Sequence, residues 1–270
     1  MNCSERIRYL ETYQGNNRSV KQVVEYWKNA YQEISIRSIR LEPVITENGR
    51  AIYEKVQVTT KKGKTVSAKF IRPADDGPFP LLLLFHDLAR PCRGWFHMTR
   101  FVTMGWAVMA IENAEQLTKE DLTDEILKVL YQNALILTKA AVMLPDIDSQ
   151  VIGTWGEGFG GGLAIVSAAL SEERTLCTCL NPLPAGRENP LVSIENFTPL
   201  LHGYFLMGTG MMDDMADPEG QFAAYNRAGC EKKHLVYPKF GHERINHFED
   251  QHLMQMEQYK KEFSVNPEQR

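Results

Sequence analysis

The pattern of hydrophobic and polar positions along the chain changes near residue 80. Before it, residues 20–31 place apolar side chains at helical spacing, which predicts an amphipathic helix. Residues 52–60 and 65–71 each alternate apolar and polar positions around a turn that contains Gly63. This pattern predicts two strands joined by a turn.

Beyond residue 80, short continuous apolar runs alternate with helical segments. The apolar runs are residues 81–85, 106–111, 151–155, 176–180, 204–207 and 234–237, and the helical segments are residues 124–143, 160–170, 219–228 and 248–263. Continuous apolar strands that alternate with helices are typical of a parallel sheet covered on both faces. We therefore expect a single α/β domain over residues 1–270, with a mostly parallel central sheet flanked by helices and an N-terminal helical extension over residues 1–50.

Composition and charge exclude several classes of protein. Hydrophobic residues make up 43% of the 270 positions and charged residues 24%, which is enough apolar material for a substantial core. The net charge of −4 argues against a nucleic-acid partner. No run approaches about 18 apolar residues, and the N-terminus lacks an apolar signal core, so we expect no membrane association. Five cysteines without a spaced framework favour a reduced, cytoplasmic protein.

The most informative segment is VIGTWGEGFGGGL, which starts at residue 151. A strand that runs into a glycine-rich turn and then a small-residue helix is the layout of the nucleophile elbow, G-x-S-x-G. Gly156 and Gly160 supply the two outer glycines, which such a turn needs because its neighbouring backbones pass close together. The nucleophile position between them holds Gly158, which carries no hydroxyl.

The same glycines also fit a dinucleotide-binding pattern. Gly156, Gly158 and Gly161 match G-x-G-x-x-G. That pattern normally belongs to the first strand of its sheet, and the next strand should end in an acidic residue. Here several strands come first and the next strand reads LCTCLNP, so we expect no nucleotide cofactor and no other cofactor.

Two later segments favour a hydrolase. Asp213 follows one predicted strand in GTGMMDD, and His242 follows the next in YPKFGHE. Hydrolases with this elbow take their catalytic residues in the order nucleophile, acid, histidine. Gly158, Asp213 and His242 keep that order. The acid would orient the imidazole, which would move protons.

Four segments together resemble one known family. VVEYWKNAYQE is similar to its Trp-containing N-terminal helix, and IGTWGEGFGGGL is similar to its elbow. GMMDDMADPEGQFAAYN is similar to its acid segment, and YPKFGHE to its His-Glu motif. On these motifs the chain resembles the acetyl xylan esterases and cephalosporin-C deacetylases of carbohydrate esterase family seven, from about residue 20 to the last helix.

The resemblance implies an α/β-hydrolase fold and a Ser-His-Asp deacetylase that acts on an acetyl ester or acetylated sugar. It implies Asp213 as acid and His242 as base, with Glu243 completing the motif. The oxyanion hole would use the backbone N–H groups of Phe159 and Leu88. The family also tends to form rings, which implies a homo-oligomer.

Departures from the family pattern affect the chemistry. Gly158 replaces the serine, Phe159 replaces a glutamine, and of the family's Arg-Gly-Gln motif only Gln116 remains. The chain is also shorter around residues 116–122 and 183–198. Without an attacking oxygen no acyl-enzyme forms, so we expect a weak or inactive esterase, a pseudoenzyme. Gly158→Ser is then expected to give measurable acetyl-esterase activity.

Two alternatives remain. One is an active deacetylase that uses an activated water or a noncanonical nucleophile such as Cys92, whose pKa Arg90 and Arg93 could lower. The other is a non-catalytic binding or oligomer-scaffold protein. A metal site is not indicated, because His242 and His247 are one residue too far apart for H-E-x-x-H.

Overall fold

The computed structural model describes residues 2–16, 19–88, 94–112 and 117–263. Within these residues nine strands form one sheet in the order β1-β2-β3-β5-β4-β6-β7-β8-β9. The strands are β1 (Ile36–Pro43), β2 (Ala51–Thr60), β3 (Thr65–Pro73), β4 (Phe79–Phe85), β5 (Ala107–Glu112), β6 (Ile147–Glu157), β7 (Thr175–Leu180), β8 (Gly203–Gly210) and β9 (Glu231–Tyr237). The pairings of β1 with β2, β2 with β3 and β3 with β5 are antiparallel, whereas those from β5 through β4 to β9 are parallel. The predicted, mostly parallel sheet is confirmed.

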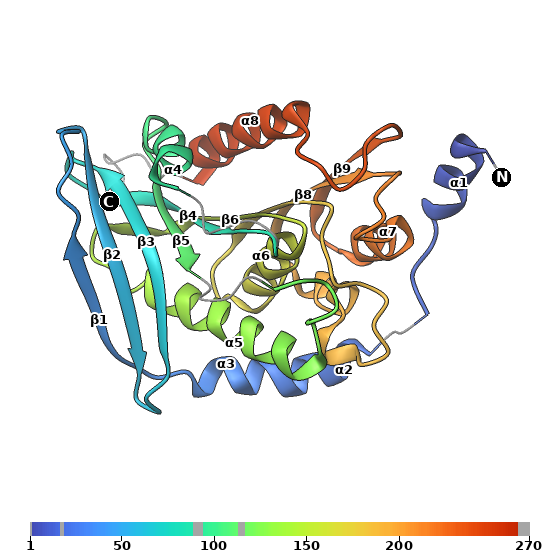
Figure 1. Ribbon diagram of the computed structural model, residues 1–270, viewed down its shortest axis with the longest axis horizontal. Helices are drawn as coiled ribbons and strands as arrows, with labels where there is room; N and C mark the ends of the chain where they lie inside the picture. The colour runs from blue at the N-terminus through green and yellow to red at the C-terminus, as the bar shows by residue number, and fades with distance from the viewer. Residues whose placement is uncertain (1, 17–18, 89–93, 113–116, 264–270) are drawn as a thin grey trace.

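Helices cover both faces of the sheet, as the apolar runs predicted (Figure 1). One face packs against α4 (Trp95–Val102) and α8 (Asn246–Phe263), and the other against α5 (Asp124–Ala141) and α6 (Phe159–Leu170). The remaining helical elements are α1 (Cys3–Leu10), α2 (Val20–Val23), the π-helical η1 (Val24–Lys28), α3 (Asn29–Glu33), the short 3₁₀ turns η2 (Pro190–Val192), η3 (Ile194–Asn196) and η4 (Thr198–Leu200), and α7 (Pro218–Arg227). None of the helices in the described ranges is long and apolar enough to cross a membrane.

The two central strands β4 and β6 position the candidate site. All seven residues of β4 are buried, because helices cover both of its faces. β4 pairs in parallel with β6 from Leu81 opposite Ile152 to Phe85 opposite Gly156. The C-terminal ends of both strands therefore meet at one edge of the sheet, where open α/β sheets carry their sites.

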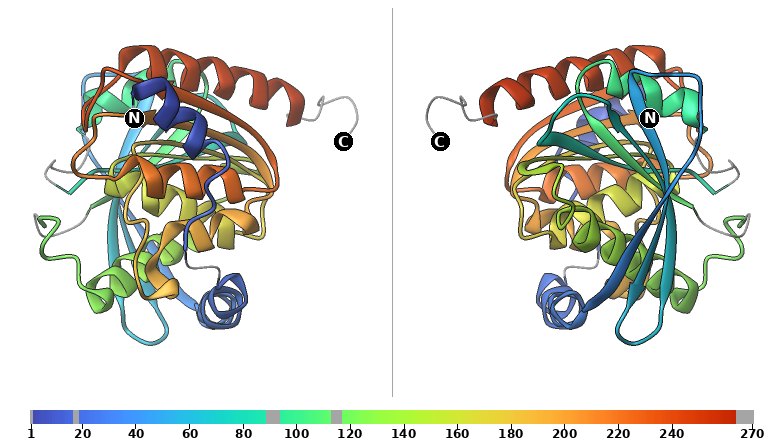
Figure 2. Two further views of the ribbon diagram at one scale, coloured as in Figure 1. Left: turned by 90° about the vertical axis from the view of Figure 1, so that its right-hand side faces the viewer. Right: turned by 90° about the vertical axis from the view of Figure 1, so that its left-hand side faces the viewer.

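The helical segment formed by α2, η1 and α3, residues 20–33, lies along the α5 side of the twisted sheet, opposite α8 (Figure 2). Its anchor is Trp27, which is 2% exposed and whose ring packs against Tyr131 and Phe197. The indole N–H donates a hydrogen bond to the carbonyl of Leu191 at 2.7 Å. The predicted helix over residues 20–31 is thus present, with a π-helical turn in its middle. Residues 36–43 of the predicted extension form β1.

Trp27→Ala should lower the free energy of unfolding by about 3–5 kcal/mol, because it leaves a large cavity and an unsatisfied carbonyl under the N-terminal helices. Urea unfolding followed by circular dichroism measures this loss. The adjacent Tyr26 is 45% exposed, and Tyr26→Ala should cost less than about 1 kcal/mol. Equal losses for the two variants would contradict the anchoring role of Trp27.

Candidate active site at the sheet edge

The elbow predicted around residue 158 is present in the structure. β6 ends at Glu157 and α6 begins at Phe159, and between them Gly158 has φ 54° and ψ −124°. A Cβ atom on Gly156 would lie 2.0 Å from the carbonyl oxygen of Gly160, and one on Gly160 would lie 2.5 Å from that of Phe85. Both outer glycines are therefore required by close backbone contacts, as the motif predicted.

The space above Gly158 is filled by a residue that the sequence did not single out, Asp87. This residue follows the end of β4, and its side chain is 10% exposed. A Cβ atom on Gly158 would lie 2.2 Å from Asp87 Oδ1. A side chain at position 158 and the observed position of the Asp87 carboxylate therefore exclude each other.

Asp87 also accepts hydrogen bonds from the two N–H groups that the sequence analysis expects in an oxyanion hole. Both Leu88 N–H and Phe159 N–H donate hydrogen bonds to Asp87 Oδ1, each at 2.9 Å. The other carboxylate oxygen, Oδ2, lies 2.9 Å from His242 Nε2. A carboxylate of the protein itself therefore lies at the position where the sequence predicts an oxyanion hole.

The structure brings the predicted acid and histidine together. His242 Nδ1 lies 2.8 Å from Asp213 Oδ2. Asp213 Oδ1 accepts hydrogen bonds from the backbone N–H groups of Met215 and Ala216, each at 2.8 Å, and its side chain is fully buried. Glu243, the other residue of the motif, is exposed, and its Oε1 accepts a hydrogen bond from Gly241 N–H at 3.3 Å.

The two flanking carboxylates change the protonation of His242. Burial by itself would lower the pKa of the imidazole, but the hydrogen bonds and charges of Asp213 and Asp87 raise it to about 9. Burial would raise the pKa of Asp87, but its hydrogen bonds to His242 and Phe159 N–H lower it below the ordinary value. The raised pKa of the imidazole favours the protonated form of His242 near neutral pH, whereas a general base must be unprotonated to accept a proton.

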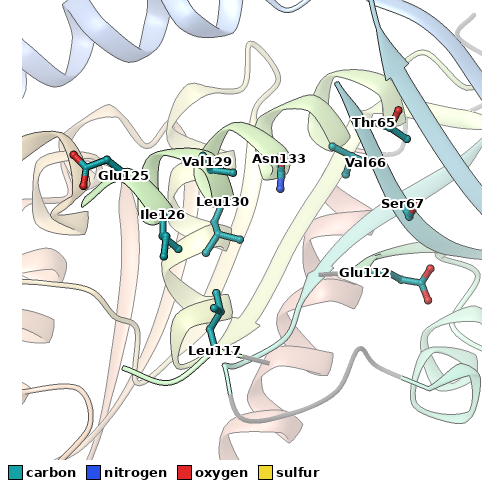
Figure 3. A pocket seen from close by; sticks show the side chains of 10 residues that line it. All are labelled: Thr65, Val66, Ser67, Glu112, Leu117, Glu125, Ile126, Val129, Leu130 and Asn133. Atoms are coloured by element: carbon teal, nitrogen blue, oxygen red, sulfur yellow. The ribbon is translucent and has the colours of Figure 1, made fainter. Parts of the chain in front are cut away.

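Among the residues that the structure describes, little free space remains beside these groups. The hollow bordered by Asp87, Gly158 and His242 measures about 10 Å³, at the lower limit for one water molecule. A larger cavity of about 440 Å³ lies elsewhere, between β3 and α5, with Ser67 on one wall and Asn133 on the other (Figure 3). Asp87, Gly158 and His242 do not line that cavity.

Several other candidates do not join the site. Cys92, Arg90, Arg93 and residues 114–116 lie outside the described residues. Within the described ranges no group of three or more potential metal ligands is present. His252, which follows His242 and His247 at five-residue spacing, is buried and its ring stacks on Trp155 at 4.5 Å.

Asp87 could have been found from one sequence signal. An acidic residue two positions after a wholly apolar strand stands next to Leu88, whose N–H the family resemblance places in the oxyanion hole. The direction of its side chain, however, depends on the backbone of that loop.

Sheet order, elbow and the acid-histidine pair together define an α/β-hydrolase, and comparison with solved structures agrees. The chain aligns with an acetyl xylan esterase from Thermoanaerobacterium sp. at a TM-score of 0.80 and 22% identity, over 93% of this chain and 98% of that one. An acetyl xylan esterase from Paenibacillus sp. R4 aligns at a TM-score of 0.80 and 18% identity, over 96% and 100%. A dienelactone hydrolase-like promiscuous phosphotriesterase from metagenomic libraries aligns at 0.62 and 15% identity, over 80% and 99%.

The family follows from the sequence comparison. The acetyl xylan esterase (AXE1) family model matches residues 4–127 and 190–260, which is more than half of the chain. The chain belongs to the acetyl xylan esterase family, as its motifs predicted. The matched segments include Asp87, Asp213 and His242 but leave out residues 128–189, which contain the elbow.

Stability should depend on pH through His242. Its pKa is raised from 6.5 to about 9 in the folded protein, so its contribution is fully present below about pH 6.5 and is lost as the pH rises through about 9. The lowered pKa of Asp87 gives a contribution that is present above its ordinary value of 3.8 and lost as the pH falls through the folded value. At full extent the rise for His242 corresponds to about 3 kcal/mol.

Urea unfolding from pH 4 to pH 10 measures this dependence. The stability difference between the native protein and His242→Gln should be largest between about pH 4 and 6.5 and should shrink towards pH 10. The exposed His247 offers a matched control, His247→Gln, whose curve should run parallel to the native one. A difference for His242→Gln that stays constant from pH 6 to pH 10 would contradict the raised pKa.

Proposed function

We propose that this member of the acetyl xylan esterase family is a non-catalytic protein with little or no ester hydrolysis. The observation that carries the proposal is the position of Asp87. Its carboxylate accepts hydrogen bonds from both N–H groups of the expected oxyanion hole. It also leaves no room for a side chain at position 158. Loss of a triad nucleophile by itself costs on the order of 10⁶-fold in turnover, and occupation of the oxyanion hole removes much of the remaining stabilisation.

The residual space and the charge of His242 also argue against the alternative of an activated water. An attacking water needs an unprotonated base and room for the ester beside it. The hollow of about 10 Å³ holds no acetyl ester, and the imidazole is protonated near neutral pH. An acetyl ester or acetylated sugar, the ligand that the family resemblance implies, would have to displace Asp87 to reach the two N–H groups.

Hydrolysis of p-nitrophenyl acetate and of acetylated xylo-oligosaccharides tests this proposal. The native protein should show no turnover above that of His242→Ala at any pH from 6 to 9. Robust turnover that His242→Ala abolishes would refute the assignment as a non-catalytic protein.

The contact between positions 158 and 87 changes the expectation for Gly158→Ser. The serine Cβ would begin 2.2 Å from Asp87 Oδ1, so we expect Gly158→Ser alone to gain no activity. The double variant Gly158→Ser/Asp87→Ala frees both the nucleophile position and the oxyanion N–H groups. It should hydrolyse p-nitrophenyl acetate at least about 10²-fold faster than the same variant with His242→Ala added, the lower end of what a general base contributes.

The matched pair of variants separates two causes of inactivity. Equal activity of Gly158→Ser and the double variant would show that Asp87 does not block the site. The homo-oligomer implied by the family resemblance stays a prediction, and size-exclusion chromatography with light scattering measures it directly.

A further inference from the structure

Asp87 and Asp213 make the same kinds of hydrogen bond, although they follow different strands, the central β4 and β8. In each carboxylate, Oδ1 accepts hydrogen bonds from two backbone N–H groups, with N···O distances of 2.8–2.9 Å. Each has its other oxygen, Oδ2, on one nitrogen of His242, at 2.8 Å for Asp213 and 2.9 Å for Asp87. The result is one imidazole between two carboxylates with matching partners.

This arrangement favours a protonated His242. A neutral imidazole has a single N–H, whereas the imidazolium donates from both nitrogens. Both ring nitrogens lie within hydrogen-bond distance of a carboxylate oxygen. Two further acidic residues, Glu157 and Glu243, border the residual hollow. Their negative charges favour the protonated form of His242. The nearby cation Arg244 is paired with Glu249.

The three side chains also connect distant parts of the chain. Asp87 follows β4, Asp213 follows β8, and His242 follows β9, and Asp87 and His242 are 155 positions apart in the sequence. Their side chains are 10%, 0% and 14% exposed. Removing one partner of such a buried ionic group leaves an uncompensated charge, which is strongly destabilising.

We propose that Leu88 N–H, Phe159 N–H and His242 form a carboxylate-binding site whose permanent ligand is the chain's own Asp87, and that this internal ligand clamps the loops after β4, β8 and β9 together. The inference goes beyond the proposed absence of turnover, which gives no reason for the acid and the histidine to remain. Hydrolysis assays test only the absence of turnover, whereas the carboxylate-binding site is tested by thermal unfolding. The two proposals can therefore fail separately.

The clamp predicts that a small external carboxylate can replace a deleted Asp87 side chain. Asp87→Ala removes only the carboxylate group, which corresponds in size to formate. Asp87→Gly removes one carbon more, and the missing group then corresponds to acetate. In both variants two N–H groups and one imidazolium N–H point into the vacated space.

Thermal unfolding at pH 7 with sodium formate or sodium acetate, against sodium chloride at equal ionic strength, tests this prediction. Asp87→Ala and Asp87→Gly should have a lower Tm than the native protein. Formate should raise the Tm of Asp87→Ala saturably, and acetate that of Asp87→Gly, because a ligand that binds only the folded state stabilises it. The native protein and the control Asp214→Ala, which changes an exposed carboxylate, should respond to each salt as to chloride.

A native-like Tm for both Asp87 variants, or a response to formate and acetate no larger than to chloride, would overturn the clamp. If neither variant folds, Asp87→Asn keeps an oxygen for the two N–H groups but removes the charge beside His242. The pKa of the His242 ring, followed by NMR, should then fall well below that of the native protein. An unchanged ring pKa in Asp87→Asn would also overturn the proposal.

Discussion

The imidazole of His242 can donate two hydrogen bonds only when it is protonated, and the C-terminal edge of the sheet is organised around that requirement. One carboxylate approaches from the loop after β8 and the other from the loop after β4, and each is held in place by two backbone N–H groups. In a working triad the imidazole must lose and regain its proton in every cycle. Here both nitrogens lie beside carboxylate oxygens, which raise the pKa of the ring to about 9 and favour its protonated form.

Gly158 and Asp87 are best understood as a pair. The strained turn at residue 158 persists, with its positive φ and its two indispensable flanking glycines, although no nucleophile uses it. What the turn provides instead is a position without a side chain, which the Asp87 carboxylate fills. This backbone is compatible with a serine at position 158 or with the observed placement of Asp87. It is not compatible with both at once.

Much of this architecture could be predicted from the sequence, because continuous apolar runs and a glycine-rich turn are local signals. Strands β2 to β9, helices α5 to α8 and the acid-histidine pair were all predicted. β1 (Ile36–Pro43) and α4 (Trp95–Val102) were missed: most of β1 is exposed and shows no clean alternation, and α4 is a short helix of eight residues. The role of Asp87 was also missed, because it depends on contacts with residues 72 and 155 positions away. The sequence shows that the serine is absent but not what takes its space.

Hydrolysis of an acetyl ester releases a carboxylic acid, so a carboxylate in the oxyanion hole has the chemistry of a reaction product. Asp87 is such a group attached covalently to the protein, and it cannot diffuse away. Its effective concentration is set by the short connection to β4 and not by the surrounding solution. On the proposed function, the site would correspond to an esterase inhibited by a carboxylate of its own chain.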